Sequence, residues 1–348
     1  MLDNIIILKI GGSSITNKGE EETLDPKALE WFAKLIASSA SETHLSSNAA
    51  PISGYNGDKP KAKFIIVHGA GSFGHHSAKR FGFRCGKSVY LEETACINQQ
   101  NNNAIDMHCQ LEGLSKTRYS VQKLNSAIVG ALLHHGVNAV GISPGLNIPS
   151  IRAHGATARA GDKSDRDESY QGMKLLCQAI HQCLQAGLLP VIHGDACLLY
   201  DDKRGGILGG DTLVEGIATI WQEINTQSSI SKVVFITDVA GVFTSDPKSN
   251  DDAVLIRHLN VNSKNGEICI VDKKVDVDDN ASLSVRSLEV GGSSHAHDVT
   301  GGLKVRGMNL IVSILCNRKY IDYILFFLQI LIRQSLVQQW LLFNLELM

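Results

Sequence analysis

Short apolar runs that end in glycine recur along this chain and constrain its fold more than any other feature. The first run, residues 5–10, ends at Gly11-Gly12, and a second, residues 64–67, is followed closely by Gly69. Runs that are apolar without alternation are typical of parallel strands buried on both faces. Three further runs of this kind cover residues 139–142, 188–192 and 232–236.

The segments between these runs have the apolar spacing of helices, as in residues 28–38, 121–134 and 174–186. Strand, glycine turn and helix in alternation predict an α/β fold, in which helices cover both faces of a parallel sheet. Two stretches interrupt the pattern. Residues 38–63 are rich in Ser, Asn, Gly and Pro and predict a surface insertion, and the polar residues 260–297 predict a long loop with a hairpin.

Composition excludes several classes of protein. With 348 residues the chain can form one large domain or two medium ones without disulfide bonds. Its 35 acidic and 33 basic side chains give a net charge of −2, so nothing supports binding to nucleic acid. The eight cysteines show no metal-binding spacing and are expected to be reduced, and the N-terminal apolar run is too short for a signal peptide, so we expect a cytosolic protein.

The densest motif is VHGAGSFGH, residues 67–75, which contains GxGxxG directly after a predicted strand. This pattern allows a dinucleotide site, with Glu92 as a candidate ribose ligand, but a single GxGxxG is weak evidence. Glycines also let the backbone approach any anionic group, and glycine turns of this kind recur along the chain. Lys9-Ile10-Gly11-Gly12-Ser13, Gly209-Gly210-Asp211 and Thr300-Gly301-Gly302 have the same character. Several such turns along one sheet favour two phosphorylated ligands that meet at the carboxyl ends of the strands.

Phosphoryl transfer also needs positive charge that can follow the migrating group. Lys9, Lys18 and His75 are the candidates, and the chain contains neither GxxxxGK[ST] nor the HRD and DFG motifs of protein kinases. Each residue also has an ordinary structural interpretation. A strand lysine commonly extends to solvent, a histidine beside a glycine turn commonly makes structural hydrogen bonds, and Asp195 and Asp211 could be turn or N-cap residues.

The motifs LKIGGSS, VHGAGSFGH, VIHGD, LGGDT, FITDVAGVF and DVTGG, read in order over residues 4–304, resemble the amino acid kinase superfamily. HGAGSFGH, with His75 at its end, is similar to the isopentenyl phosphate kinases of that superfamily, and residues 113–125 and VVFITDVAGV favour a eukaryotic member. The resemblance implies an open αβα sandwich with a mainly parallel sheet, usually dimeric. It also implies transfer of the γ-phosphoryl group of ATP to isopentenyl phosphate, which gives isopentenyl diphosphate.

The resemblance also implies a division of the chain and of the site. Residues 1–200 would bind the phosphorylated acceptor and residues 201–307 would bind ATP, with Mg²⁺ entering on the nucleotide because no metal-ligand cluster is visible. The implied catalytic residues are Lys9, Lys18, His75 and Asp211. The implied ATP-binding residues are Lys9, Gly11, Gly12, Ser13, Ala70, Asp238, Gly301, Gly302 and Arg306. The implied acceptor-binding residues are Gly69, Gly74, His75, Thr117, Gly194 and Asp195.

The C-terminal end departs from the family pattern. The superfamily usually places a lysine four residues after the last glycine pair, and here that position is Arg306, with Lys304 two residues earlier. Beyond Gly307 the resemblance ends, and we expect the family's closing helix and strand to be missing. The apolar residues 320–332 are too few to span a membrane and predict a core or interface helix. Residues 308–348 therefore form an atypical tail, for which a retained intron or an incorrect gene structure is one hypothesis.

Four functions remain open at this point. The leading one is an isopentenyl phosphate kinase that forms homodimers, binds no nucleic acid and does not insert stably into membranes. The second is a kinase of the same superfamily that acts on another phosphate or phosphonate. The third is a binding protein that has lost turnover through its altered C-terminus, and the fourth is a dinucleotide-dependent oxidoreductase.

Overall fold

A computed structural model gives the fold. It describes residues 3–17, 19–45, 63–81, 102–151, 153, 163–199, 205–225, 227–237, 242–243, 251–252, 254–256, 259–261, 268–270, 289–290 and 325–329. The central element is a six-stranded sheet in the order β13-β7-β1-β2-β4-β3. All its neighbouring strands are parallel. Its strands are β1 (Asp3–Ile10), β2 (Lys63–His68), β3 (Ala139–Ile142), β4 (Leu189–His193), β7 (Ser228–Thr237) and β13 (Leu325–Gln329).

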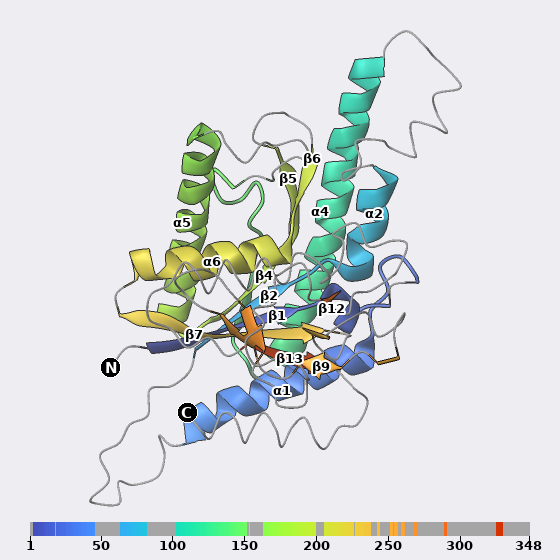
Figure 1. The fold of residues 1–348 in the computed structure, drawn as a ribbon. Helices are drawn as coiled ribbons and strands as arrows, with labels where there is room; N and C mark the ends of the chain where they lie inside the picture. The colour runs from blue at the N-terminus through green and yellow to red at the C-terminus, as the bar shows by residue number, and fades with distance from the viewer. Residues whose placement is uncertain are drawn as a thin grey trace, which may run out of the picture.

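Helices cover both faces of this sheet, as Figure 1 shows. The longer helices are α1 (Pro26–Leu45), α4 (Asn102–His134), α5 (Lys163–Gln185) and α6 (Gly210–Ile224). The short helices are α2 (His75–Arg80), η1 (Gly12–Ser14) and η2 (Gly71–Phe73). The αβα architecture with a mainly parallel sheet is therefore confirmed.

The sequence of β1 explains the two layers of the core. Successive strand residues point to opposite faces of a sheet. Ile5 and Ile7 are buried in one apolar cluster with α5 and α6, whereas Ile6, Leu8 and Ile10 are buried in another with α1 and α4. Lys9 follows the odd-numbered residues and therefore lies on the face that α6 covers.

The predicted strands agree with the observed ones to within a few residues, but three helices are longer than predicted. Helix α5 begins at Lys163 rather than near residue 174. Helix α1 continues to Leu45, so the first part of the predicted insertion 38–63 is helical, and residues 46–62 lie outside the described residues. Helix α4 begins at Asn102 rather than near residue 121, although its sequence includes Gly113. A Cβ at Gly113 would lie 2.4 Å from the Phe81 ring, so glycine is needed there for packing against the end of α2.

The helix predicted in the C-terminal tail is wrong at residues 325–329, the part of the tail that the structure describes. Within residues 320–332, predicted as a helix, the structure has the strand β13, which pairs in parallel with β7 from Leu325 opposite Val233 to Gln329 opposite Thr237. Leu-Phe-Phe-Leu is a sequence of high β-propensity, and the free edge of β7 offers unpaired backbone groups that such a segment can use. The sheet therefore does have a further strand beside β7, which the sequence had led us to expect missing.

The remaining strands form small antiparallel sheets. Strands β5 (Asp195–Leu198) and β6 (Gly205–Leu208) make one pair, and β10 (Leu259–Val261) and β11 (Ile268–Ile270) make another. The second pair confirms the hairpin predicted within residues 260–297. Strand β8 (Val242–Phe243) lies between β9 (Leu255–Ile256) and β12 (Glu289–Val290).

Candidate active site

The glycine turns that follow the parallel strands β1, β2 and β4 lie side by side. The Gly11 N–H donates to Ile236 O on β7 (2.7 Å), the Gly69 N–H donates to Ile10 O on β1 (2.9 Å), and the Gly194 N–H donates to His68 O on β2 (2.8 Å). Each bond continues the parallel ladder one step beyond the strand. The turns after β1, β2 and β4 are therefore fixed in one row, beside the end of β7, at the carboxyl edge of the sheet, where ligands of open α/β sheets bind.

Two of these turns are in direct backbone contact. A Cβ at Gly12 would lie 2.1 Å from Gly71 N, and Gly71 has φ +53°, a left-handed conformation that favours glycine. The backbone of the first turn can approach that of the second only because neither residue has a side chain. Such a surface can present peptide N–H groups to anionic ligands, so the turns fit phosphate groups.

Lys9 and Asp211 form an ion pair beside this junction. Lys9 is the penultimate residue of β1, and Asp211 is in the first turn of α6, which has no side-chain N-cap. Lys9 Nζ lies 2.9 Å from Asp211 Oδ1, with 11% and 26% of the two side chains exposed. An ammonium has three N–H groups, so the lysine retains donors for a ligand beside this carboxylate.

His75 is the first residue of α2, immediately after the second glycine turn. It is half-buried. A Cβ at Gly74 would lie 2.6 Å from Ala70 Cβ and 2.9 Å from Val121 Cγ2, so the turn packs tightly against α4 just before His75. This packing fixes the start of α2 and hence the place of the histidine relative to the glycine turns.

Thr117 is buried in the interface of α4 and α2. Its hydroxyl donates to Ser77 Oγ at 2.8 Å, and 1% of the residue is exposed. Its predicted contact with the acceptor stays a prediction, because the structure shows this hydroxyl bonded to α2.

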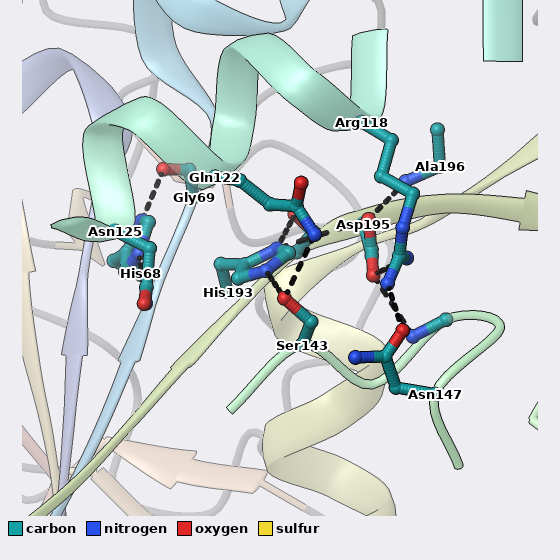
Figure 2. A network of polar contacts seen from close by, with 12 residues as sticks. His68, Gly69, Arg118, Gln122, Asn125, Ser143, Asn147, His193, Asp195 and Ala196 are labelled. Carbon is teal, nitrogen blue, oxygen red and sulfur yellow. Dashed lines mark hydrogen bonds and ion pairs between the residues drawn. The ribbon is translucent and has the colours of Figure 1, made fainter. Parts of the chain in front are cut away.

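Asp195 lies in the buried polar network shown in Figure 2. Its Oδ2 accepts a short hydrogen bond from Arg118 Nη1 and one from the Gly145 N–H at 2.9 Å, while Oδ1 accepts from the Ala196 N–H at 2.9 Å. The side chain is fully buried. Burial raises the pKa of Asp195 to about 7, against the opposite effects of Arg118 and the backbone N–H groups. Arg118 Nη2 also donates to Asn147 Oδ1 at 2.7 Å.

His68 and His193 are buried and lie opposite each other at the ends of β2 and β4, each directly before a glycine turn. His68 Nδ1 donates to Gly69 O and His193 Nδ1 donates to Gly194 O, each at 3.0 Å. Nε2 of His68 accepts from Asn125 Nδ2 at 3.1 Å, and Nε2 of His193 accepts from Ser143 Oγ at 2.7 Å. Ser143 Oγ in turn accepts from Gln122 Nε2 at 3.2 Å, as Figure 2 shows.

These bonds assign one proton to each ring and so a neutral state. Burial lowers the pKa of His68 to about 3, with a further contribution from His193, and burial lowers the pKa of His193 to about 4. The two imidazoles therefore do not supply charge to a ligand. They hold the carbonyl groups of the glycines that follow them.

The structure brings together most of the residues predicted from sequence. Gly11, Gly12 and Ser13 lie at the end of β1, next to Lys9 and Asp211, and Gly69, Ala70, Gly74 and His75 lie in the second turn, with Gly194 and Asp195 beyond it. Lys18, Asp238, Gly301, Gly302 and Arg306 lie outside the described residues.

Sequence reasoning missed the polar side chains behind the turns. Arg118, Gln122 and Asn125 lie on α4 at spacings of three and four residues, which places them on one helix face. The repeated His-Gly after an apolar run, in VHGAG and VIHGD, was the available signal for His68 and His193.

In the part of the chain that the structure describes, no group of three or more His, Cys, Asp or Glu side chains is placed to hold a metal ion. Within that same part, no helix combines the length and the apolar character that crossing a membrane requires.

An open parallel sheet with glycine turns and a lysine at its carboxyl edge, in a chain with no P-loop sequence, fits an α/β protein that binds phosphate groups in a way other than that of the P-loop enzymes. The chain matches the amino acid kinase family over residues 4–304. It is 33% identical over 254 residues to isopentenyl phosphate kinase of Methanothermobacter thermautotrophicus, covering 72% of this chain and 74% of the relative. It is 30% identical over 319 residues to isopentenyl phosphate kinase of Arabidopsis thaliana, covering 86% and 81%.

A solved structure agrees with these sequence relatives. Crystallographic work described as X-ray structures of isopentenyl phosphate kinase gives a match with TM-score 0.50 and 29% identity, over 72% of this chain and 80% of that one. The chain belongs to the amino acid kinase family and, within it, to the isopentenyl phosphate kinases.

Proposed function

We propose that this protein is an ATP-dependent kinase that phosphorylates isopentenyl phosphate to isopentenyl diphosphate. The observation that carries the proposal is the Lys9–Asp211 ion pair at the junction of the glycine turns, in a chain of this family. A flexible cation beside a row of peptide N–H groups is what transfer between two phosphate groups requires.

The reaction joins an oxygen of the acceptor phosphate to the γ-phosphorus of ATP and breaks the bond to the β-phosphate oxygen, so ADP leaves. Gly11, Gly12 and Ser13 would bind the ATP phosphates together with the N-terminal turn of α6, and Lys9 would follow the transferred group. Asp211 would hold Lys9 in place through charge, and the ammonium would keep N–H groups for phosphate oxygens. Lys18, Asp238, Gly301, Gly302 and Arg306 complete the proposed ATP side.

The acceptor phosphate would lie on the second turn, against Gly69, Ala70 and Gly74, with a charged hydrogen bond from His75. Gly194, which follows β4, and Asp195, the first residue of β5, would flank this position. The buried bonds of Asp195 support an indirect role, in which its carboxylate fixes the turn rather than touching the phosphate. The isoprenoid tail needs an apolar pocket, and we place it toward the α4 face that includes Thr117.

Four further features of the proposal rest on the sequence and the family. Mg²⁺ would enter bound to ATP, where it would neutralise phosphate charge. The acceptor-binding and ATP-binding parts would divide near residue 200. The protein would form homodimers and act in the cytosol.

Acceptor-dependent ADP release by the purified chain tests the proposal. With Mg·ATP, addition of isopentenyl phosphate should raise ADP release well above the ATP-only rate. His75→Ala should lower the turnover about 100-fold or more while ATP binding measured by calorimetry stays unchanged, because in this proposal His75 binds the acceptor phosphate and not ATP. His76→Ala, one residue along α2, is the matched control.

Two outcomes would overturn parts of this assignment. Equal loss of turnover and of ATP affinity in His75→Ala would remove the histidine from the acceptor site. A wild-type chain that releases ADP with another phosphomonoester or phosphonate but not with isopentenyl phosphate would keep the reaction class and change the substrate.

A further inference from the structure

The hydroxyl group of Thr16 lies between the two glycine turns that the proposed function assigns to different substrates. Thr16 Oγ1 donates to Gly12 O in the first turn at 2.8 Å and accepts the N–H of Ser72 in the second turn at 3.1 Å. Thr16 is buried, with 4% exposed. A hydroxyl group has one proton to donate and lone pairs that accept. Here the proton is donated to the carbonyl of the first turn, and a lone pair accepts the N–H of the second turn.

The space around this hydroxyl is closed. A Cβ at Gly71 would lie 2.3 Å from Thr16 Oγ1 and 2.7 Å from Gly12 O. The Thr16 hydroxyl, Gly12 O and the Ser72 N–H therefore form a compact unit, which we call the clasp. Because Thr16 is buried, removal of the hydroxyl would leave the Ser72 N–H without its partner and the Gly12 carbonyl with only the longer bond from the Ile15 N–H, at 3.3 Å, among the described residues.

The clasp continues outward through Ser72. Ser72 Oγ donates to Thr23 O at 3.0 Å and accepts the Thr23 N–H at 3.1 Å, and the Glu22 N–H donates to Ser72 O at 3.2 Å. Glu22 also pairs with Lys123 of α4 at 2.7 Å. The second turn is thus tied to the segment after Thr16, to the first turn and to α4 at once.

Transfer between two bound phosphates depends on the separation of the reacting atoms. A near-attack arrangement needs the oxygen and phosphorus about 3–3.5 Å apart, and a shift of about 1 Å can cost about 100-fold in rate. The first turn would hold the ATP phosphates and the second the acceptor phosphate. Whatever fixes the distance between the turns fixes the distance between the substrates.

We propose that Thr16 is a positioning residue that sets the separation of donor and acceptor phosphates through the clasp, without touching either substrate. The proposal rests on the proposed function, because it needs one substrate on each turn. It adds a residue to the glycine, lysine and histidine residues of the proposed function. Unlike them, Thr16 would act only through the backbone of the two turns.

Thr16→Val is the informative variant, because valine has the shape of threonine without the hydroxyl. We expect kcat to fall about 10- to 100-fold while KM for ATP and for isopentenyl phosphate each change less than about threefold. Thr16→Ser keeps the hydroxyl and should restore most of kcat. Ser228→Ala is the matched control, because it removes a buried hydroxyl that accepts from Trp221 Nε1 at 3.2 Å, at the amino end of β7. It should lower stability without a comparable loss of kcat.

A second measurement does not depend on turnover. A bisubstrate ligand, in which adenosine and an isopentenyl group are joined by a chain of four phosphates, spans both turns and should bind about 10- to 100-fold more weakly to Thr16→Val. ATP alone and isopentenyl phosphate alone should bind both proteins equally.

The outcomes separate the two proposals. If Thr16→Val keeps wild-type kcat and bisubstrate affinity, or loses no more than Ser228→Ala, the positioning role is overturned and the proposed function stands. If the wild-type chain binds the bisubstrate ligand no better than ATP, the assignment of one substrate to each turn fails, and the role of Thr16 fails with it.

Discussion

Two Gly-Asp pairs in this protein look alike in sequence and differ in the fold. Gly194-Asp195 and Gly210-Asp211 both follow apolar segments, and each aspartate is paired with a basic side chain. The Asp195 carboxylate is fully buried and accepts from Arg118, Gly145 and Ala196. The Asp211 carboxylate is about one-quarter exposed, and its Oδ1 lies 2.9 Å from Lys9 Nζ.

The difference shows how one dipeptide can serve two purposes. A carboxylate whose oxygens are occupied by three donors can hold elements together but has little capacity left for a ligand. A carboxylate that holds a lysine through charge at the edge of a glycine junction leaves the lysine able to move with a phosphoryl group. We therefore assign Asp195 and Arg118 to the stability of the fold, and Asp211 and Lys9 to the rate of the reaction.

Replacement of the two basic residues by the same apolar one should separate these assignments most clearly. Arg118→Met leaves a buried carboxylate without its charged partner and should lower the free energy of unfolding by about 3–5 kcal/mol. Lys9→Met should lower it by less, because water reaches part of the Asp211 side chain, which is 26% exposed, and none of the Asp195 side chain. Urea unfolding of both variants measures the difference, and equal losses would contradict the comparison.

The effects on catalysis should be reversed. Lys9→Met should lower kcat about 100- to 1,000-fold with the fold retained, because the cation that stabilises the migrating phosphoryl group is lost. Asp211→Asn keeps the shape but not the charge that holds Lys9, and should cost about tenfold. Steady-state ADP release is the measurement, with Asp195→Asn assayed below its unfolding temperature as the matched control. A larger loss of kcat in Asp195→Asn than in Asp211→Asn would reverse our assignment.

A further expected effect is on the pH dependence of stability. His68 and His193 have folded-state pKa values of about 3 and about 4, below the value near 6.5 of an unfolded histidine. Their contribution is therefore full above about pH 6.5 and is lost as the pH falls toward 4, at about 1.4 kcal/mol per pH unit for each ring. Asp195, with its raised pKa of about 7, acts in the opposite direction as the pH rises from about 4 to 7.

His68→Gln tests this balance. Between pH 6 and 4.5 the free energy of unfolding should depend less steeply on pH in the variant than in the wild type, by about 1.4 kcal/mol per pH unit. The reason is that one histidine no longer has to stay neutral in the fold. Above pH 7.5 the slopes of variant and wild type should coincide. Unchanged slopes below pH 6 would mean that His68 is already protonated in the folded protein.

Prediction from sequence succeeded where the signal is local. Apolar runs and glycine turns identified strands β1, β2, β3, β4 and β7, since a strand buried on both faces must be apolar at every position. It failed at β13, because residues 320–332 are too uniformly apolar to distinguish a strand from a helix by periodicity, and only the free edge of β7 selects the strand. The same limit applies to α4, whose N-terminal half has no helical signature until Phe81 packs against Gly113.

The sequence by itself determined the fold class, the family and the glycine turns, because each depends on residues that are neighbours in the chain. Only the tertiary structure decided which polar residues share a site. Thr16 meets Ser72 and Arg118 meets Asp195 across separations of 56 and 77 residues, and Lys9 of the first strand meets Asp211 of α6. Such pairs form because parallel strands bring their carboxyl ends to one edge, and the order of strands in the sheet, which no local pattern encodes, decides which ends are adjacent.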